Sequence, residues 1–163
     1  MEVIIQPNQE AAASLVARVV AHDLRANPHL VLGLATGSTM ECVYRHLVRM
    51  HREEKLDFSL CSTFNLDEYV GLFPSDPNSY RHYMDHHLFH HVNIDPRNTH
   101  LPNGLATDLD ACLGQSVRVA DRHVLHSAVA VMDQALRVAA GVQRLLQRVQ
   151  GQVAAQRARH PPA

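Results

Sequence analysis

The first part of the chain alternates short apolar runs with stretches in which apolar residues recur every three or four positions. The apolar runs at residues 30–34 and 60–64 have the length of strands buried on both faces, as in parallel sheets. One-sided helical spacing occupies residues 8–24 and 40–52. Strands that alternate with helices predict an α/β fold with a mostly parallel, doubly wound sheet.

Weaker patterns predict further elements around this core. A strand is expected at residues 3–5, a third helix at residues 78–89 and a short strand at residues 99–101. Asn8 precedes the first helix and is expected to cap it. The apolar residues expected on the buried face of that helix are Ala12, Leu15, Val16, Val19, Val20 and Leu24. In the second helix they are Val43, Leu47 and Met50.

The composition changes near Cys112. All eight aromatic residues lie between Tyr44 and Phe89, whereas residues 113–163 contain seven arginines, two aspartates and neither phenylalanine nor tyrosine. Apolar residues between positions 125 and 153 recur at helical steps. The sequence therefore predicts two segments, an α/β portion over residues 1–112 and a divergent helical tail over residues 113–163.

Charge and cysteine content restrict the function classes. A net charge of −1 gives no support for nucleic-acid binding. No apolar stretch is long enough to span a bilayer, and the N-terminus lacks the features of a signal peptide. Three widely spaced cysteines fit neither a disulfide framework nor a Cys-x-x-Cys metal site. We therefore expect a cytoplasmic protein in a reducing compartment, with no membrane partner.

A loop at residues 34–39 joins the first buried strand to the second helix. Gly37 permits a positive φ, so that backbone N–H groups can converge, and Ser38 and Thr39 add hydroxyl donors that can also cap the helix. The positive end of the helix dipole favours an anion at this position. The pattern predicts a site for a phosphorylated small molecule. The alternative is an ordinary strand-to-helix turn without a ligand.

Asp67 and Glu68 follow the next buried strand. Because the carboxyl ends of parallel strands lie on one edge of a sheet, this acidic pair is expected near the loop at residues 34–39. A carboxylate held there can act as a general base. Neighbouring side chains point to opposite sides, so one carboxylate should face the ligand while the other holds the loop through backbone N–H groups or a basic partner. The alternative is a solvated acidic turn.

Histidines in the third predicted helix form two pairs at a four-residue spacing, His86 with His90 and His87 with His91. Such pairs can chelate a metal ion. Because Tyr83, Leu88 and Phe89 supply the apolar face of the same helix, exposed histidines without a metal are the preferred interpretation. No metal site is predicted.

Taken together, the two loops closely resemble those of the glucosamine-6-phosphate deaminase family. The matching blocks are Leu-Gly-Leu-Ala-Thr-Gly-Ser-Thr at residues 32–39 and Thr-Phe-Asn-Leu-Asp-Glu-Tyr-Val-Gly-Leu at residues 63–72. Further matches are Asp-Pro-Asn-Ser-Tyr at residues 76–80, Leu-Pro-Asn-Gly at residues 101–104 and Asp-Leu-Asp-Ala-Cys at residues 108–112. The resemblance covers about residues 1–112.

The resemblance implies a three-layer, Rossmann-like α/β fold of the kind shared with phosphogluconolactonases and ribose-phosphate isomerases. It implies conversion of glucosamine 6-phosphate and water to fructose 6-phosphate and ammonia in amino-sugar catabolism, without a cofactor. Asp67 matches the family's enolisation base. The sugar-phosphate loop corresponds to Thr36, Gly37, Ser38 and Thr39, and the positions that shape the pocket correspond to Glu68 and Tyr69. Met40 stands where proline is usual.

The sequence contains no counterpart of the family's later Asn-Gly-His motif, whose histidine and acids assist ring opening, or of its later phosphate-clamping residues. We therefore expect low turnover from this chain. One alternative is a non-catalytic sugar-phosphate-binding protein in which the tail helix mediates homo-oligomerisation. Another is a hydrolase that resembles 6-phosphogluconolactonase, although the Asp67-Glu68-Tyr69 context favours the deaminase.

Overall fold

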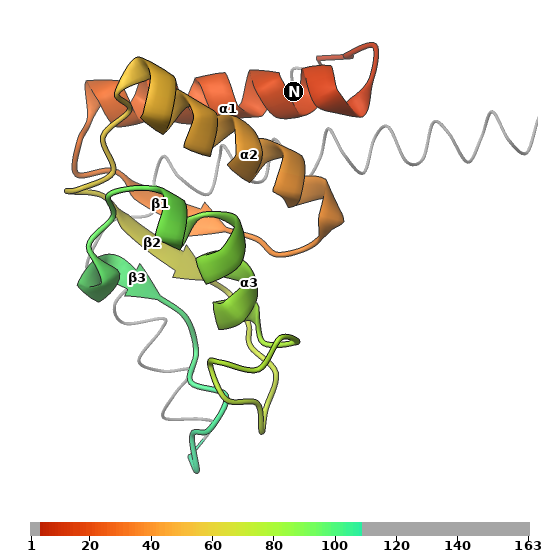
Figure 1. Ribbon diagram of the computed structural model, residues 1–163, viewed down its shortest axis with the longest axis vertical. Coiled ribbons are helices and arrows are strands. Elements are labelled where there is room, and N and C mark those ends of the chain that lie inside the picture. The colour runs from red at the N-terminus through yellow and green to blue at the C-terminus, as the bar shows by residue number, and fades with distance from the viewer. Residues whose placement is uncertain (1–3, 109–163) are drawn as a thin grey trace, which may run out of the picture.

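The computed structural model of the protein describes residues 4–108, and Figure 1 shows their arrangement. In chain order they form α1 (Gln9–Ala26), β1 (Val31–Leu34), α2 (Ser38–Glu54), β2 (Ser62–Asn65), α3 (Tyr80–His87) and β3 (Thr99–His100). Short 3-10 helices occupy Phe89–His91 and Pro96–Asn98. The predicted tail over residues 113–163 lies outside the described residues. No helix within residues 4–108 combines the length and apolarity needed to cross a bilayer.

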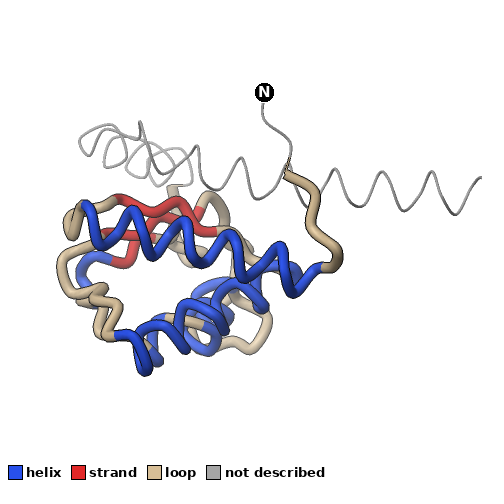
Figure 2. The backbone as a smooth tube through the Cα atoms, turned by 90° about the horizontal axis from the view of Figure 1, so that it is seen from above, coloured by secondary structure: helices blue, strands red, loops and turns tan. Residues whose placement is uncertain are grey.

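The strands, which Figure 2 draws in red, form one parallel sheet. Their order in the sheet is β1-β2-β3. Leu34 is in register with Asn65, and Thr63 is in register with Thr99. Each pair of neighbouring strands is joined by a crossover that contains a helix. These observations confirm the prediction of a parallel α/β sheet and place the carboxyl ends of β1 and β2 side by side.

The hydrophobic core joins buried residues of α1, β1 and α2 with Met84 of α3. Leu32 and Leu34 of β1 contribute to it, and α1 and α2 pack against each other (Figure 1). On α2 the predicted inward residues Val43, Leu47 and Met50 are all buried. The prediction for α2 is therefore confirmed in both its extent and its buried face.

Helix α1 begins as predicted, and its predicted buried face is confirmed only in part: Val20 and Leu24 are buried and Val16 packs against the core. The Asn8 side chain accepts a hydrogen bond from the Ala11 N–H at 2.8 Å, which confirms the cap. Val19, expected to be buried, is 38% exposed. The buried residues are Ala13, Ala17, Val20, Ala21 and Leu24. Three of these residues are alanines, whose small side chains allow α1 to pack closely.

Two other predictions at element ends are wrong within the described residues. Ile4 and Ile5 are exposed and extend no strand, because β1, β2 and β3 pair with one another and none of them pairs with this segment. A strand without a paired neighbour leaves its backbone groups unsatisfied. The third helix ends at His87 rather than at residue 89, because Leu88 has φ −139° and ψ −61°, outside the helical region.

Candidate functional site

The predicted phosphate loop follows β1 directly. Gly37 has φ +119° and is the N-cap residue of α2, so a residue with a side chain would be strained there. Ser38 and Thr39 are the first two residues of the helix and are exposed. No side chain caps α2, contrary to the expectation that Ser38 or Thr39 would do so. Within the described residues no side chain therefore occupies the N–H groups of Ser38 and Thr39, which can bind an anion, whereas the Met40 N–H donates to the Gly37 carbonyl at 2.9 Å.

Two tyrosines hold the backbone of this loop. The Tyr44 hydroxyl donates a hydrogen bond to the Ala35 carbonyl, and the Tyr83 hydroxyl donates to the Gly37 carbonyl at 2.8 Å. The two rings meet edge to face, with centroids 6.4 Å apart. Burial raises the pKa of Tyr44, and partial burial raises the pKa of Tyr83 to about 12, so both stay neutral donors. Sequence reasoning missed both residues, since neither belongs to a loop motif.

Asp67 lies just beyond β2, at the same edge of the sheet. The link between the two strand ends is Asn65, which is 4% exposed and whose side-chain amide donates to the Leu34 carbonyl at 3.0 Å. The Asp67 side chain is exposed, and within residues 4–108 it forms no hydrogen bond or ion pair. Its carboxylate therefore remains available to accept a proton from a ligand.

Glu68 is the carboxylate that holds the loop. It accepts hydrogen bonds from the backbone N–H groups of Tyr69 at 2.8 Å, Tyr80 at 2.9 Å and Arg81 at 2.9 Å. Tyr80 and Arg81 open α3, so the carboxylate also compensates the positive end of that helix. Asp67 and Glu68 thus have different surroundings, as expected for neighbours on an extended segment.

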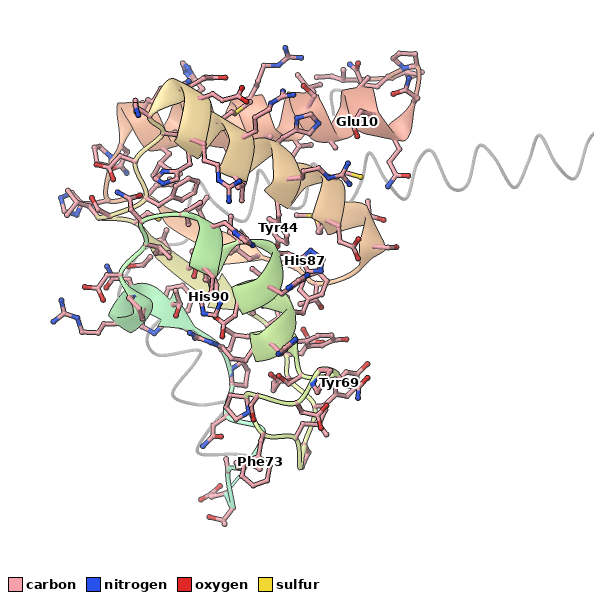
Figure 3. All side chains as sticks on the ribbon, viewed as in Figure 1. Glu10, Tyr44, Tyr69, Phe73, His87 and His90 are labelled. Atoms are coloured by element: carbon pink, nitrogen blue, oxygen red, sulfur yellow. The ribbon has the colours of Figure 1, made fainter. Side chains whose placement is uncertain are left out.

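Tyr69 lies at the rim of this region, below the start of α3 in Figure 3. Its ring packs on the ring of Tyr80 with centroids 4.9 Å apart, and the two hydroxyl oxygens lie 3.3 Å apart. The hydrogen bond to Tyr80, supported by the charges of Asp67 and Glu68, raises the pKa of Tyr69. The side chain is 52% exposed, so it can contact a ligand held between the loop and Asp67.

The segment that carries Asp67 and Glu68 is fixed from the other side by a turn after β3. The Gly71 N–H donates to the Gly104 carbonyl at 2.7 Å. A Cβ atom on Gly104 would lie 2.4 Å from the Tyr69 carbonyl oxygen, so only glycine fits. Two separate blocks of the sequence, at residues 63–72 and 101–104, therefore meet in space.

The histidine pairs do not form a metal site. Among residues 4–108, no group of three histidine, cysteine or acidic side chains could hold a metal ion. Both pairs, His86 with His90 and His87 with His91, span the end of α3, so their four-residue spacing is not helical. The geometry instead brings together a backbone anion site, a carboxylate that has no partner in the described part of the chain, and a tyrosine. This arrangement suits binding of a phosphorylated molecule and proton transfer within it.

Comparison with known proteins agrees with this arrangement. Residues 6–152 match the family described as glucosamine-6-phosphate isomerases/6-phosphogluconolactonase. The chain is 47% identical over 110 residues to a glucosamine-6-phosphate deaminase of Thermoanaerobacter sp. (strain X514), covering 68% of this chain and 44% of that protein. It is 58% identical over 95 residues to glucosamine-6-phosphate deaminase 2 of Giardia intestinalis, covering 58% of this chain and 36% of that protein.

Among solved structures, a monomeric glucosamine-6-phosphate deaminase superposes with a TM-score of 0.73 at 41% identity. The superposition covers 75% of this chain and 51% of that one. The chain thus spans about half the length of these proteins or less. The likeness confirms the predicted fold class, whereas the predicted boundary at residue 112 stays a prediction.

Proposed function

The chain belongs to the family of glucosamine-6-phosphate isomerases and 6-phosphogluconolactonases, and from this membership we propose that it acts on glucosamine 6-phosphate as part of a deaminase. Two relatives named glucosamine-6-phosphate deaminase, at 47% and 58% identity, support this substrate over the lactone. The proposed overall reaction converts glucosamine 6-phosphate and water to fructose 6-phosphate and ammonia. We place this reaction in amino-sugar catabolism in the cytoplasm.

In this proposal the loop formed by Thr36, Gly37, Ser38 and Thr39 holds the substrate phosphate. Backbone N–H groups at the start of α2 point toward the anion, and the helix dipole adds to their attraction. The Ser38 and Thr39 hydroxyl groups are exposed at the same place and can donate further hydrogen bonds. The hydroxyl groups of Tyr44 and Tyr83 donate to the carbonyls of Ala35 and Gly37 and hold the loop backbone in place.

Asp67 is the proposed base. It removes the proton from C2 of the opened sugar and returns it to C1, which turns the aldose into a C2 imine. Water then adds to C2, its oxygen becomes the ketone oxygen, and ammonia leaves. No redox change occurs, so this step needs no redox cofactor. Glu68 and Tyr69 shape the pocket, the first by holding α3 in place and the second by lining the rim.

The observation that supports this proposal most directly is the position of Asp67. Its carboxylate is exposed and has no partner within residues 4–108. It follows closely after Asn65, whose hydrogen bond to Leu34 joins its strand to the strand that leads into the phosphate loop. A base and an anion site on adjacent strand ends are what proton transfer on a small sugar phosphate requires.

The test is proton exchange rather than full turnover. Because the sequence has no counterpart of the Asn-Gly-His motif, we expect low ammonia release. Exchange at C1 of fructose 6-phosphate in deuterated water needs only the loop and the base, and NMR can follow it directly. We expect the 163-residue chain to catalyse slow exchange and Asp67→Asn to lower its rate by about 100-fold or more.

Asp23→Asn is the matched control, because Asp23 lies on α1 and its side chain makes no hydrogen bond or ion pair within the described residues. It removes the same charge and should leave the exchange rate unchanged. Exchange that continues at the full rate in Asp67→Asn, with Asp23→Asn behaving identically, would show that another group is the base.

A further inference from the structure

A concave surface is lined by residues that take no part in the site described above. It is a groove of about 300 Å³ between α2 and the segment formed by α3 and the following 3-10 helix, and we call it the α2–α3 groove. Figure 3 labels His87 on the side of α3 that faces α2. The titratable and charged residues that line the groove are Glu41, Arg45, Arg52, His86, His87 and His91.

The two arginines give the groove its permanent charge. Arg45 and Arg52 are seven residues apart on α2, so they lie on one face of the helix, about 10 Å apart along its axis. Within residues 4–108 neither guanidinium pairs with a carboxylate. Arg45 Nη2 lies 3.5 Å from Cys42 Sγ, and Arg52 Nη2 lies 3.3 Å from His91 Nδ1. Both therefore keep donors that are free to bind an anion.

Three other arginines of the described residues are paired with carboxylates. Arg25 pairs with Glu54 at 2.8 Å, Arg81 with Asp85 at 3.1 Å, and Arg97 with Asp95 at 2.6 Å. Arg45 and Arg52 differ from these residues because the single acid of the groove, Glu41, pairs with neither of them. Two guanidinium groups on one wall of a concave surface, neither of them paired with a carboxylate of the described residues, can bind the same anion. An isolated surface arginine cannot do this.

The histidines on the opposite wall make this charge depend on pH. His91 Nε2 lies 2.8 Å from the His86 carbonyl, so neutral His91 carries its proton on Nε2 and accepts from Arg52 at Nδ1. Protonation of His91 would end that contact and release the arginine. Partial burial lowers the pKa of His87, repulsion from His86 and His91 acts in the same direction, and Glu41 opposes it. A bound anion would favour the charged form of His87.

From this geometry we propose that the α2–α3 groove binds a small phosphorylated anion at a site distinct from the phosphate loop. Guanidinium groups recognise phosphate through paired hydrogen bonds, and the groove has the volume of a small-molecule site. The chain's net charge of −1 disfavours a nucleic acid as the ligand. Binding should strengthen as the pH falls, because protonated histidines add charge to the wall that faces the arginines.

The probe is inorganic pyrophosphate, titrated calorimetrically into the 163-residue chain at about pH 6 and about pH 8, on either side of the usual histidine pKa. We expect tighter binding at the lower pH. The double substitution Arg45→Gln with Arg52→Gln should weaken it about tenfold or more, since two charge-assisted contacts are lost. Arg18→Gln removes an arginine of α1 that has no ion pair within the described residues, and it should leave the affinity within about twofold.

Two more variants separate this site from the fold and from the proposed catalytic role of Asp67. Arg45→Lys with Arg52→Lys keeps both charges and should retain affinity within about fivefold. Asp67→Asn should leave pyrophosphate binding unchanged, so failure of the proposed catalytic role would not affect this result. The proposal is overturned if pyrophosphate does not bind at about pH 6, if the glutamine double variant binds as tightly as the unmodified chain, or if Arg18→Gln loses as much affinity. Tighter binding of single-stranded DNA through the same arginines would also overturn it in favour of a polynucleotide ligand.

Discussion

The side-chain amide of Asn65 donates a hydrogen bond to the backbone carbonyl of Leu34, with a nitrogen–oxygen distance of 3.0 Å. The two residues are also register partners at the carboxyl ends of β1 and β2. The bond therefore joins the strand that leads into the phosphate loop to the strand that leads to Asp67. The other side-chain atom, Asn65 Oδ1, is buried without a partner within the described residues. Burial of this unpaired oxygen costs free energy.

We predict that Asn65→Ala destabilises the fold and separates the two halves of the site. Loss of the bond leaves the Leu34 carbonyl without its side-chain donor, which should lower the free energy of unfolding by about 1–3 kcal/mol. Urea denaturation measures this change. Asn98→Ala is the control, because the Asn98 side chain makes no hydrogen bond within residues 4–108, and its effect should stay within about 0.5 kcal/mol. Equal effects of the two substitutions would remove the structural role assigned to Asn65.

Glu68 and Asp67 should respond differently to the same chemical change. Glu68→Gln replaces a carboxylate that accepts three backbone N–H groups, so one N–H must face an amide nitrogen, and the charge at the start of α3 is lost. We expect a loss of about 1–2 kcal/mol in the free energy of unfolding. Asp67→Asn should leave the urea midpoint unchanged and abolish isotope exchange. If Asp67→Asn lowered the urea midpoint and Glu68→Gln abolished isotope exchange, the roles of the two carboxylates would have to be exchanged.

The sequence predicted the strands β1, β2 and β3 and the edge at which the site forms, because these depend on local apolar runs and on the rule that parallel strands end together. It also indicated that one of the two carboxylates would hold the loop. The residue pattern alone could not identify which, since two of the three N–H groups that bind Glu68 come from residues twelve and thirteen positions later. The role of Tyr83 in holding the phosphate loop could not be predicted for the same reason, because its partner Gly37 is 46 positions away.

Tyr83→Phe tests whether the hydroxyl positions the phosphate loop. Removing the bond to the Gly37 carbonyl should loosen the residue that caps α2, while the ring still packs on Tyr44. We expect the affinity for glucosamine 6-phosphate to fall about three- to tenfold, which corresponds to the usual net value of one hydrogen bond. Thermal shift at several ligand concentrations gives the affinity. Tyr80→Phe, which alters a contact between two tyrosine hydroxyls at the rim, is the control and should change it less.

Stability should fall at alkaline pH because of Cys61. Burial raises the pKa of this thiol from 9.0 to about 12 in the folded chain. The unfolded chain therefore loses the proton at a lower pH than the folded chain does, and deprotonation favours unfolding as the pH rises through this interval. Urea midpoints measured across this interval should decline with pH, and Cys61→Ala should make the decline shallower. An identical slope in both proteins would assign the decline to other groups.

Gly104 and Gly33 provide the last comparison, since both can be changed to alanine with opposite expectations. A Cβ on Gly104 would lie 2.4 Å from the Tyr69 carbonyl oxygen and 3.1 Å from the Leu72 carbonyl oxygen, which are backbone atoms that cannot rotate away. Gly104→Ala must therefore push the turn off the segment that carries Glu68, and the Gly71–Gly104 hydrogen bond at 2.7 Å should weaken with it. We expect a loss of about 1–3 kcal/mol in stability.

Gly33→Ala should be tolerated. No atom lies within 4 Å of a Cβ built on this residue, and β1 has ordinary strand geometry there. Because alanine reduces the conformational freedom of the unfolded chain, the variant should be unchanged or more stable by up to about 1 kcal/mol. Urea denaturation of both variants measures the difference, and isotope exchange at fructose 6-phosphate shows whether Gly104→Ala also displaces the catalytic segment. If Gly104→Ala is as stable as Gly33→Ala, then the turn after β3 does not brace the loop, and the position of Asp67 must depend on β2 and α3 alone.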